Sequence, residues 1–413
     1  MNRNKSPRLR FAGFAGEWEE KKIGDVFQVT SGTTPLRSNA DYFNNGFIDW
    51  VKTTDLNNSL LEKTEEKVSE IALNKTSLRI LPKGTVFVAM YGGFNQIGRT
   101  GLLNVNATCN QALAAILPEK SQNPFYLLTY LNYSVGHWKN IAASSRKDPN
   151  ITKQDVLDFK ISLPSEPEQT ALGDFFRRLD ETLAQARARL AKTLQLKRAM
   201  LAKLFPAQGE TAPKLRFKGF SGDWERKMLG EIGNTFGGLT NKSREDFGHG
   251  AARYITYLNV YQNAISSATQ LDSIEIDDKQ NAVKKGDVLF TTSSETPEEV
   301  GMSSVWTFDM ENVYLNSFCF GYRLNEPLDS NYLAYCLRSD YVRSQMILLA
   351  QGISRYNISK KGVMEIEILI PTPEEQTAIG NFFRQLDQTL ALQSAALGKL
   401  TRLKKALLAA MLV

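Results

Sequence analysis

Side chains that could carry out acid–base, metal or redox chemistry are scarce in this sequence of 413 residues. There are two histidines, His137 and His249, and neither has a metal-ligand spacing around it, so imidazole offers little scope for general acid–base catalysis. The three cysteines, Cys109, Cys319 and Cys336, are scattered without C-x-x-C spacing. That pattern suits a reducing compartment and argues against both a disulfide framework and a zinc site. We therefore expect no bound metal.

One short string has a candidate catalytic role. Asn123-Pro124-Phe125-Tyr126 is similar to the N-P-P-[FY] loop with which amino-methyltransferases hold a flipped adenine, but Phe125 stands where that loop has proline. The chain has no G-x-x-x-x-G-K-[ST] phosphate loop, no dinucleotide fingerprint and no histidine-based triad. In the second half of the chain, Asp329 precedes a matching helical stretch. Asn123 and Asp329 are therefore predicted to be helix N-caps, and no catalytic residue is predicted.

The elements that must position any functional side chain are two long repeated helices. The stretch LPSEPEQTALGDFF at 163–176 matches IPTPEEQTAIGNFF at 370–383, which indicates an internal duplication. Apolar residues then recur at alternating spacings of three and four, which favours a coiled coil. Each helix is expected to run for roughly 35 to 40 residues, or ~50 to 60 Å. The predicted seam positions are Phe176, Leu179, Leu183, Ala186 and Leu190 in the first helix and Phe383, Leu386, Leu390, Leu397, Leu400 and Leu407 in the second.

Two matching seams in one chain predict that the helices pair with each other, antiparallel. Lys197 and Lys404 fall at equivalent places on the seams, as a polar pair that sets the register would. The alternative is that each helix packs only on its neighbouring domain.

The start of each helix carries a predicted capping box. Ser165 with Glu168, and Thr372 with Glu375, have the S/T-x-x-E spacing in which the two residues satisfy each other's free backbone amides.

The duplication extends to the segment that opens each half. Pro7–Trp18 is matched by Pro213–Trp224, with the same arginine, phenylalanine, glycine and tryptophan pattern. We expect Trp18 and Trp224 to be packing anchors.

Between each opening and its long helix lies a variable stretch, about 25–160 and 231–369. Both stretches contain predicted strands, glycine turns and a helix, which is typical of an α+β domain. Both also place a cysteine, Cys109 or Cys319, in what reads as a shared strand. The helices that follow are predicted from Pro124 to about residue 138 and from Ser330 to about residue 348.

The predicted architecture is α+β, with two similar domains, each followed by a long helix, and a pseudo-two-fold internal duplication. The polar segment at 207–213 is a linker between the halves. The predicted boundaries are 1–163 for the first domain, 164–206 for the central helix, 207–370 for the second domain and 371–413 for the C-terminal helix.

Composition limits the class of protein. Hydrophobic residues make up 42% of the chain and charged residues 23%, as in ordinary soluble proteins. A net charge of +6 with a pI of about 9.0 is compatible with nucleic acid, although many proteins without that partner share it. No apolar run approaches the ~20 residues of a membrane span. The basic N-terminus is followed by no apolar core of the kind a secretory signal needs, so we expect a cytoplasmic protein.

Together these motifs resemble the DNA-specificity (HsdS) subunit of bacterial type I restriction–modification systems. The resemblance rests on the Pro-x-[LI]-R-F-x-G-F-x-G-x-W openings at 7–18 and 213–224, the E-Q-x-A helix entries at 164–176 and 371–383, and the duplicated layout. It covers nearly the whole chain, and its motifs are specific as a set.

The resemblance implies a non-catalytic subunit with two target-recognition domains. Each domain reads one half of a split, asymmetric sequence in double-stranded DNA, and the paired helices set the gap and dock two methyltransferase (M) subunits. Restriction/translocase (R) subunits complete the restriction enzyme used in phage defence. This chain then binds no cofactor, since S-adenosylmethionine, ATP and Mg²⁺ are used by the partner subunits in adenine-N6 DNA methylation and restriction. The pairs Glu168-Gln169 and Glu375-Gln376 are candidates for touching the methyltransferases, with helix capping as the simpler role for the glutamates.

Candidate DNA contacts follow from side-chain chemistry, because Arg, Lys, Asn and Gln read base edges and Lys, Arg, Ser and Thr bind phosphates. For each candidate, a solvated surface role is an equal alternative. In the first domain the candidates are Lys52, Thr53, Thr54, Asn95, Arg99, Arg146 and Lys147. Asn95 and Arg99 belong to a glycine-rich turn at 90–99, which has the flexibility and polar side chains that a loop probing a DNA groove needs. In the second domain they are Lys242, Arg244, Arg253, Tyr257, Ser293, Ser294, Arg355, Tyr356 and Asn357.

Three other functions remain open from the sequence. A stand-alone DNA-binding regulator with two fused modules would bind a specific duplex without partners. A coiled-coil scaffold would show no salt-dependent affinity for DNA. An enzyme acting alone would transfer methyl groups to DNA without partners.

Overall fold

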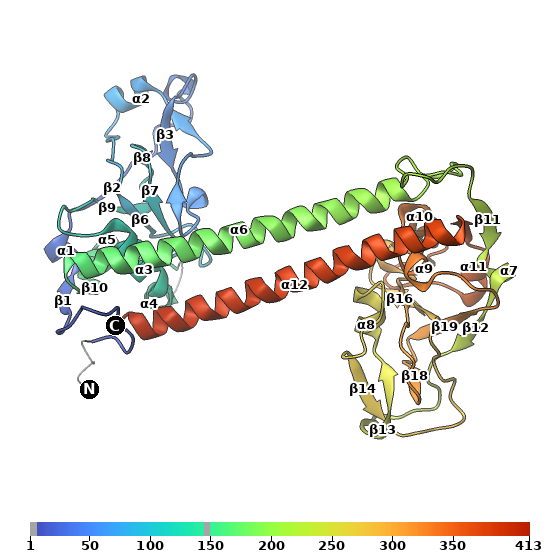
Figure 1. Cartoon of the computed structure of the whole chain (residues 1–413). Helices are drawn as coiled ribbons and strands as arrows, with labels where there is room; N and C mark the ends of the chain where they lie inside the picture. The colour runs from blue at the N-terminus through green and yellow to red at the C-terminus, as the bar shows by residue number, and fades with distance from the viewer. Residues whose placement is uncertain (1–5, 144–148) are drawn as a thin grey trace. The chain divides into compact units, whose positions relative to one another are not determined.

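The computed structural model describes residues 6–143 and 149–413, and the chain divides into two compact units (Figure 1). Unit 1 contains residues up to Arg187 together with Ala396–Val413, and unit 2 contains Ala188–Ala395. Each unit holds one of the two variable stretches and a part of both long helices.

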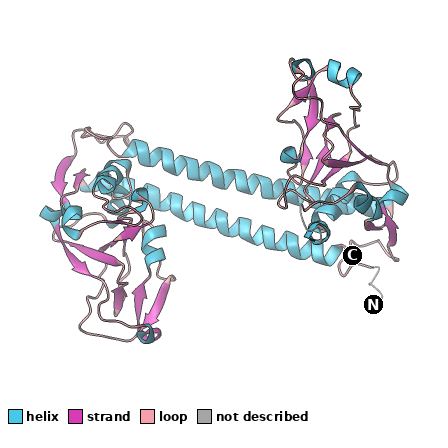
Figure 2. Cartoon of the chain, turned by 180° about the vertical axis from the view of Figure 1, so that it is seen from behind, coloured by secondary structure: helices cyan, strands magenta, loops and turns pink. Residues whose placement is uncertain are grey.

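Unit 1 is built on three small sheets, drawn as magenta arrows in Figure 2. The largest has the strand order β2-β9-β6-β7-β4, with β2 (Val29–Ser31), β9 (Leu113–Ile116), β6 (Val86–Ala89), β7 (Thr100–Leu103) and β4 (Leu60–Leu61). The others are β5-β3-β8, with β5 (Lys67–Val68), β3 (Ile48–Val51) and β8 (Thr108–Cys109), and the pair β1 (Glu19–Lys22) with β10 (Lys160–Leu163). The short helices are α1 (Ile23–Val26), α2 (Glu70–Lys75), α3 (Pro124–Tyr133), α4 (Val135–Ala143) and α5 (Lys153–Asp158), with 3-10 turns η1 (Ala40–Tyr42) and η2 (Thr53–Asp55).

Unit 2 repeats this layout in outline, with a four-stranded main sheet and one additional strand pair. Its main sheet has the order β12-β19-β15-β17, with β12 (Gly233–Gly237), β19 (Cys319–Leu324), β15 (Val288–Thr291) and β17 (Ser303–Val305). The smaller sheets are β14 (Leu271–Ile274), β13 (Phe247–Ile255) and β18 (Val313–Leu315), the pair β11 (Glu225–Met228) with β21 (Glu367–Ile370), and the pair β16 (Ser293–Ser294) with β20 (Tyr356–Asn357). The short helices are α7 (Leu229–Ile232), α8 (Tyr257–Gln262), α9 (Ser330–Cys336), α10 (Asp340–Leu348) and α11 (Lys360–Met364), with 3-10 turns η3 (Arg244–Asp246) and η4 (Pro297–Glu299).

The two long helices are α6 (Glu166–Leu204) and α12 (Pro373–Met411), each of 39 residues. In unit 1 the start of α6 packs against the end of α12, since Phe176 and Met411 share one buried core. In unit 2 the end of α6 packs against the start of α12, where Leu204 and Phe383 share another. The predicted antiparallel pairing is therefore confirmed, and each helix end also packs on the core of its own unit. All predicted seam residues are buried or half-buried.

The predicted register lysines each meet an aspartate on the opposite helix. Lys197 of α6 pairs with Asp387 of α12 at 2.5 Å in unit 2, and Lys404 of α12 pairs with Asp180 of α6 in unit 1. The two pairs occupy equivalent positions in the duplicated sequence, so each unit contains one of them.

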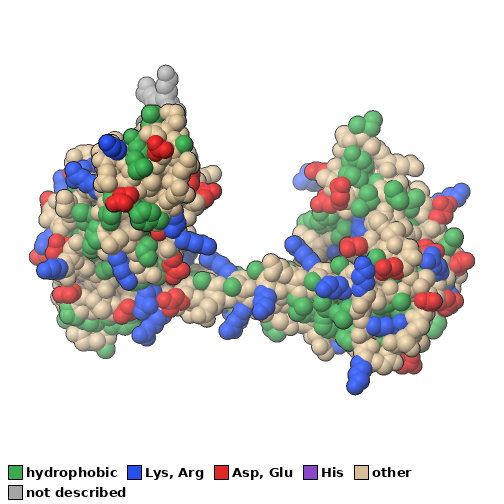
Figure 3. Space-filling model, turned by 90° about the horizontal axis from the view of Figure 1, so that it is seen from above, with side chains coloured by type: hydrophobic (Ala, Val, Ile, Leu, Met, Phe, Trp, Pro, Cys, Tyr) green, Lys and Arg blue, Asp and Glu red, His purple; other side chains and the backbone are tan. Residues whose placement is uncertain are grey.

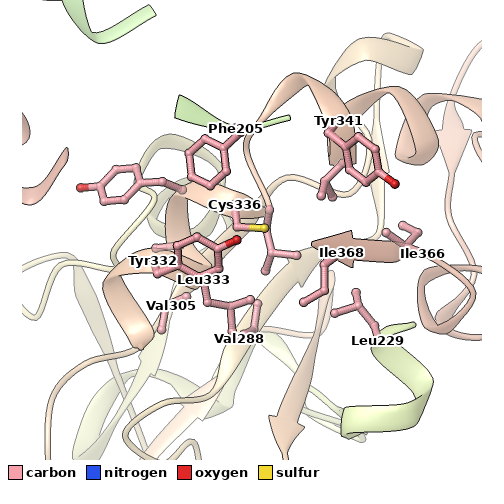
Figure 4. Close-up of a cluster of buried hydrophobic side chains, with 14 of the residues drawn as sticks. Phe205, Leu229, Val288, Val305, Tyr332, Leu333, Cys336, Tyr341, Ile366 and Ile368 are labelled. Atoms are coloured by element: carbon pink, nitrogen blue, oxygen red, sulfur yellow. The ribbon is translucent and has the colours of Figure 1, made fainter. Parts of the chain in front are cut away.

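Aromatic and aliphatic side chains fill the core of each unit. In unit 2, buried residues of α9 pack between the main sheet and β21, and Tyr332 and Leu333 lie beside Val288, Val305 and the other residues of Figure 4. In unit 1 a corresponding core of buried aromatic and aliphatic residues joins α3, β6, β9, the start of α6 and the end of α12.

Glycines at one turn are equivalent in the two units. Gly84 and Gly286 precede β6 and β15, and both have a φ of +92°, a left-handed conformation that other residues adopt only at a cost. The turn predicted from the sequence is confirmed in both halves.

Several local predictions were wrong. Each predicted single helix is two helices, broken at Ser134 between α3 and α4 and at 337–339 between α9 and α10. The cysteines are not equivalent: Cys109 lies in β8, which pairs in parallel with β3, whereas the matching strand β18 ends at Leu315 and Cys319 starts the following strand. Similar runs of β-prone residues four positions apart misled the alignment.

The N-cap prediction is confirmed. Asn123 Oδ1 accepts hydrogen bonds from the amides of Phe125 and Tyr126 at 3.0 and 3.1 Å, and Asp329 Oδ1 accepts one from Tyr332 at 2.8 Å. In the part of the chain that the structure describes, no helix combines the length and apolarity of a membrane span, and no cluster of His, Cys, Asp and Glu could hold a metal ion.

Candidate nucleic-acid interface

A buried ion pair fixes the start of each long helix to the opening segment of its half. Arg10 donates to both carboxylate oxygens of Glu168 at 2.7 and 2.6 Å, and Arg216 does the same to Glu375 at 2.7 Å each. Glu168 and Glu375 are only 1% and 0% exposed. The glutamates thus serve these bidentate pairs, so the expected surface role toward a partner is wrong for them. The expected capping is only half present: the amide of Glu375 donates to the hydroxyl of Thr372 at 3.4 Å, but the glutamate carboxylates bond arginine and not the helix start.

The glutamines of the E-Q pairs are also internal. Gln169 Oε1 accepts from the amide of Asn123, the residue that caps α3, and Gln169 Nε2 donates to the carbonyl of Pro164. Gln376 makes the same two bonds, to Asp329 and Pro371. These side chains lock the long helix to the short helix beside it.

The opening segments also hold the ends of the long helices. The amide of Leu9 donates to the carbonyl of Ala410 in unit 1, and the amide of Leu215 donates to Lys203 in unit 2, both at 2.9 Å. Trp18 and Trp224 are buried at 2% and 3% exposure, as predicted for packing anchors. We call these repeated contacts the frame.

On this frame, four chain segments meet in each unit. In unit 1 the amide of Asn110 donates to the carbonyl of Val51 and the amide of Ile151 donates to that of Met90. In unit 2 the amide of Asn316 donates to the carbonyl of Ile255 and the amide of Ile358 donates to that of Thr292. The segments after β3 or β13, after β8 or β18, after β6 or β15, and before α5 or α11 are therefore joined in the same way twice.

The first cleft lies at this junction in unit 1 and has a volume of about 420 Å³. Two glycines shape its loop, with φ of +118° at Gly92 and +98° at Gly93. The Thr53 hydroxyl is 3.2 Å from where a Cβ at Gly92 would lie, so a larger residue would crowd it. The described lining residues carry no charge and are Tyr91, Gly92, Gly93, Pro149 and Asn150.

The second cleft lies at the equivalent junction in unit 2 and has a volume of about 450 Å³. Tyr257 and Tyr261 stack there with ring centroids 6.0 Å apart. Its lining is partly charged and consists of Tyr257, Leu258, Tyr261, Ser293, Ser294, Glu295, Glu299, Ser354 and Arg355.

The structure brings together most of the DNA-contact candidates of the second domain. Four of them line the second cleft, namely Tyr257, Ser293, Ser294 and Arg355. Two more, Tyr356 and Asn357, form β20, which pairs with Ser294 and Ser293 of β16. In the first domain, Thr53 adjoins the first cleft, while Asn95 and Arg99 lie in the loop that continues from its lining, with Asn95 exposed.

Three other candidates already use their polar groups within the chain. Lys52 is 16% exposed and pairs with Glu65 and Glu66, and although burial works against its charge, these carboxylates raise the pKa of Lys52. Lys242 pairs with Asp277 at 2.8 Å, and this bond raises the pKa of Lys242. Arg253 donates to the hydroxyl of Ser273. Each would exchange an internal bond for a phosphate contact.

The remaining candidates lie elsewhere. Thr54 and Arg244 are exposed, on η2 and η3, and neither lines a cleft. Arg146 and Lys147 lie outside the described residues.

The predicted turn at 90–99 supplies Tyr91, Gly92 and Gly93 to the first cleft, whereas sequence reasoning missed Pro149 and Asn150 there, and Leu258, Tyr261, Glu295, Glu299 and Ser354 in the second cleft. Aligning the two halves of the sequence with Asn110 opposite Asn316 would have pointed to these loops, because the two asparagines occupy equivalent positions beside the clefts.

The long helices expose apolar side chains at equivalent positions. Leu196 of α6 is 45% exposed and Leu403 of α12 is 50% exposed. A separate hollow of about 950 Å³ in unit 2 is bordered by α6, α9 and α12, and the cations Lys285 and Arg384 there have no bonded partner among the described residues. Such surfaces are typical of contacts with other proteins.

Charge does not mark the face drawn in Figure 3 as a DNA surface. Basic and acidic side chains are mixed over both units there, with no large patch of one sign.

Comparison with known proteins agrees with this organisation. A family model described as "Type I restriction modification DNA specificity domain" matches residues 15–195 and again 221–402. The MjaIX specificity subunit of Methanocaldococcus jannaschii is 24% identical over 371 residues, which is 86% of this chain and 83% of that protein. A type I restriction enzyme specificity subunit of Escherichia coli is 22% identical over 188 residues, and the chain spans only 46% of that relative's length.

Solved structures share the fold. The S subunit of a type I restriction–modification system from M. genitalium superposes with a TM-score of 0.62 at 16% identity, covering 99% of both chains. A structure from work on assembly of the type I R-M system superposes with a TM-score of 0.52 at 17% identity, covering 95% of this chain and 96% of that one.

Proposed function

The chain belongs to the family defined by the type I restriction–modification DNA specificity domain, and on that premise we propose that it is the DNA-specificity subunit of such a complex. In this proposal each cleft reads one half of an asymmetric, two-part target in double-stranded DNA. The observation that carries it is the pair of equivalent clefts on one repeated frame, with different side chains at the same places.

The two clefts are lined by different side chains on the same frame, which supports recognition of two different half-site sequences. A frame built from the Arg10 and Arg216 ion pairs and from backbone bonds is independent of the loop side chains, so the loops can vary without loss of the fold. Because base edges are read by side chains, two dissimilar clefts predict two dissimilar sequences.

We further propose that α6 and α12 set the gap between the half-sites and dock two methyltransferase subunits. Both helices have the same length and each contributes to both units, so lengthening them would move the units apart by ~1.5 Å per added residue. The exposed Leu196 and Leu403 support two equivalent docking surfaces, one per methyltransferase.

The partners supply the chemistry in this proposal. The methyltransferases would bind S-adenosylmethionine and methylate adenine N6, and restriction subunits would use ATP and Mg²⁺, in the cytoplasm where the DNA lies. This chain would contribute recognition of the DNA target sequence.

The test is base-resolved methylome sequencing of cells that express this chain with its methyltransferase, against cells that lack this chain. We expect a new N6-methyladenine motif in two dissimilar parts with a fixed gap. Absence of a split motif despite an assembled, active methyltransferase would contradict the proposal and favour a stand-alone DNA-binding regulator.

A variant with four extra residues in α6 and four in α12 tests the role of the helices. The same two half-sites should be methylated with a wider gap. An unchanged gap would remove the helices from the spacing mechanism while leaving the clefts in place.

A further inference from the structure

The second cleft contains an acidic and a basic side chain for which the described residues provide no hydrogen-bond or ion-pair partner. In the part of the chain that the structure describes, the carboxylate of Glu295 and the guanidinium of Arg355 make no hydrogen bond or ion pair. Both residues are exposed. Of the charged side chains that line this cleft, only Glu299 is bonded among the described residues, to the hydroxyl of Tyr261. Two unmatched charges in one cleft indicate groups kept free for a ligand.

The wall around these two charges is held in place. Tyr257 donates to the carbonyl of Ser293 at 2.7 Å, and Tyr261 donates to Glu299 Oε1 at 2.5 Å. The bond to Glu299 raises the pKa of Tyr261 to about 12, so the phenol keeps its proton and Glu299 stays engaged. Half-buried Arg338 donates to the carbonyl of Tyr261 at 3.0 Å and anchors α8. Glu299 is thus structural, and Glu295 is the free carboxylate.

An ionised carboxylate in a DNA-facing cleft is repelled by phosphates, so it weakens sequence-independent binding. Because it only accepts hydrogen bonds, it bonds only to base edges that offer a donor and so discriminates among bases. Guanine and thymine offer only acceptors in the major groove, and the amino group of adenine lies beside the acceptor N7. Cytosine N4 is the donor that suits a carboxylate, and guanine O6 and N7 suit an arginine fork.

We propose that the second cleft reads a C·G base pair, with Glu295 accepting from the cytosine amino group and Arg355 donating to the guanine. This inference rests on the proposed function and specifies the half-site of unit 2. The described residues that line the first cleft are uncharged, so they do not indicate a particular base pair in the other half-site.

The experiment compares methylomes of the assembled complex carrying the wild-type chain, Glu295→Gln, Arg355→Ala and the control Glu298→Gln. Glu298 is an exposed carboxylate three positions from Glu295 that does not line the cleft. The half-site of unit 2 is identified as the half that changes when residues 231–369 are exchanged for those of another specificity subunit.

We expect an invariant C·G pair in that half for the wild-type chain. Glu295→Gln should reduce discrimination at that pair by roughly 10- to 100-fold, since a good base contact contributes about 1–3 kcal/mol. Arg355→Ala should relax the same pair, and Glu298→Gln should leave the motif unchanged. The other half and the gap should be unaffected in all variants.

Binding of the purified complex to four duplexes that differ only at that pair gives a second readout, which does not depend on methylation in cells. Glu295→Gln should lose the preference for C·G with little loss of affinity for the other three. A split motif without an invariant C·G in this half, or one that Glu295→Gln leaves unchanged, overturns this inference and leaves the proposed function standing. A wild-type complex that produces no split motif overturns both.

Discussion

The first and second clefts occupy the same place in their units but present different chemistry. The described lining of the first cleft is uncharged and shaped by Gly92 and Gly93, whereas the second combines a tyrosine stack with Glu295 and Arg355. The strands that carry the two clefts follow the same order, with the same backbone bonds at the junction. The comparison shows that the frame is the same in both units, whereas the side chains that line the clefts differ.

The largest effect should follow from making the two clefts alike. Replacing residues 25–160 by a second copy of 231–369, with the frame kept, should convert the asymmetric target into an inverted repeat of one half-site. The pseudo-two-fold relation of the helix pairs predicts inversion. Methylome sequencing reads the result directly, and a motif that retained its original first half would show that the first cleft does not determine it.

The frame ion pairs should give the next largest effect, and it should be equal in the two units. Arg10→Ala or Arg216→Ala leaves a buried glutamate without its partner, which costs about 3–5 kcal/mol of folding free energy. Chemical denaturation of the purified chain measures this. Removing both partners together, as in Arg10→Met with Glu168→Leu, should cost less than the single change. A single change that costs under about 1 kcal/mol would mean that the pair is not needed to hold the helix start.

Alanine substitution at the equivalent glycine turns should destabilise the two units by slightly different amounts. Alanine at Gly84 or Gly286 forces a left-handed conformation on a residue with a Cβ, at about 1–2 kcal/mol. The new Cβ at 84 would lie 3.3 Å from Pro118, whereas at 286 the nearest atom is 4.0 Å away. Gly84→Ala should therefore be at least as destabilising as Gly286→Ala in thermal unfolding, and the reverse order would contradict this packing difference.

The smallest effect should come from the register lysines. Half-exposed ion pairs of this kind contribute about 0–1 kcal/mol, so Lys404→Ala should change stability little. Lys197 also lies 5.4 Å from the ring centroid of Tyr335, whose hydroxyl donates to Asp387 at 2.8 Å. Lys197→Ala should cost more than Lys404→Ala by about 0.5 kcal/mol. Equal losses in a denaturation series would mean that Tyr335 adds nothing to the pair.

Much of the fold could be predicted from the sequence because its signals are local or repeated. The seam of Phe176 to Leu407, the N-caps at Asn123 and Asp329 and the turn glycines Gly84 and Gly286 depend on neighbouring residues alone. The duplication added the antiparallel pairing, since two equal seams in one chain have an evident partner.

The rest could not be predicted because it depends on contacts far apart in the chain. Glu168 looked like a capping residue until Arg10, far away in sequence, was seen to bind it. Lys52 and Lys242 looked like free cations, but Glu66 and Asp277, which are distant from them in the sequence, form ion pairs with them. Glu295 drew no attention because its value depends on the cleft around it.

The central claim is that the two clefts face two different halves of the DNA target. A photo-crosslinking amino acid at Asn150 or at Glu295, in the complex assembled with methyltransferase and bound to its target duplex, tests this most directly, with exposed Asp278 in unit 2 as the control position. We expect strong crosslinks from both cleft positions, Asn150 to one half-site and Glu295 to the other, and few from Asp278. Crosslinks from both cleft positions to the same half, or yields no higher than at Asp278, would contradict the account.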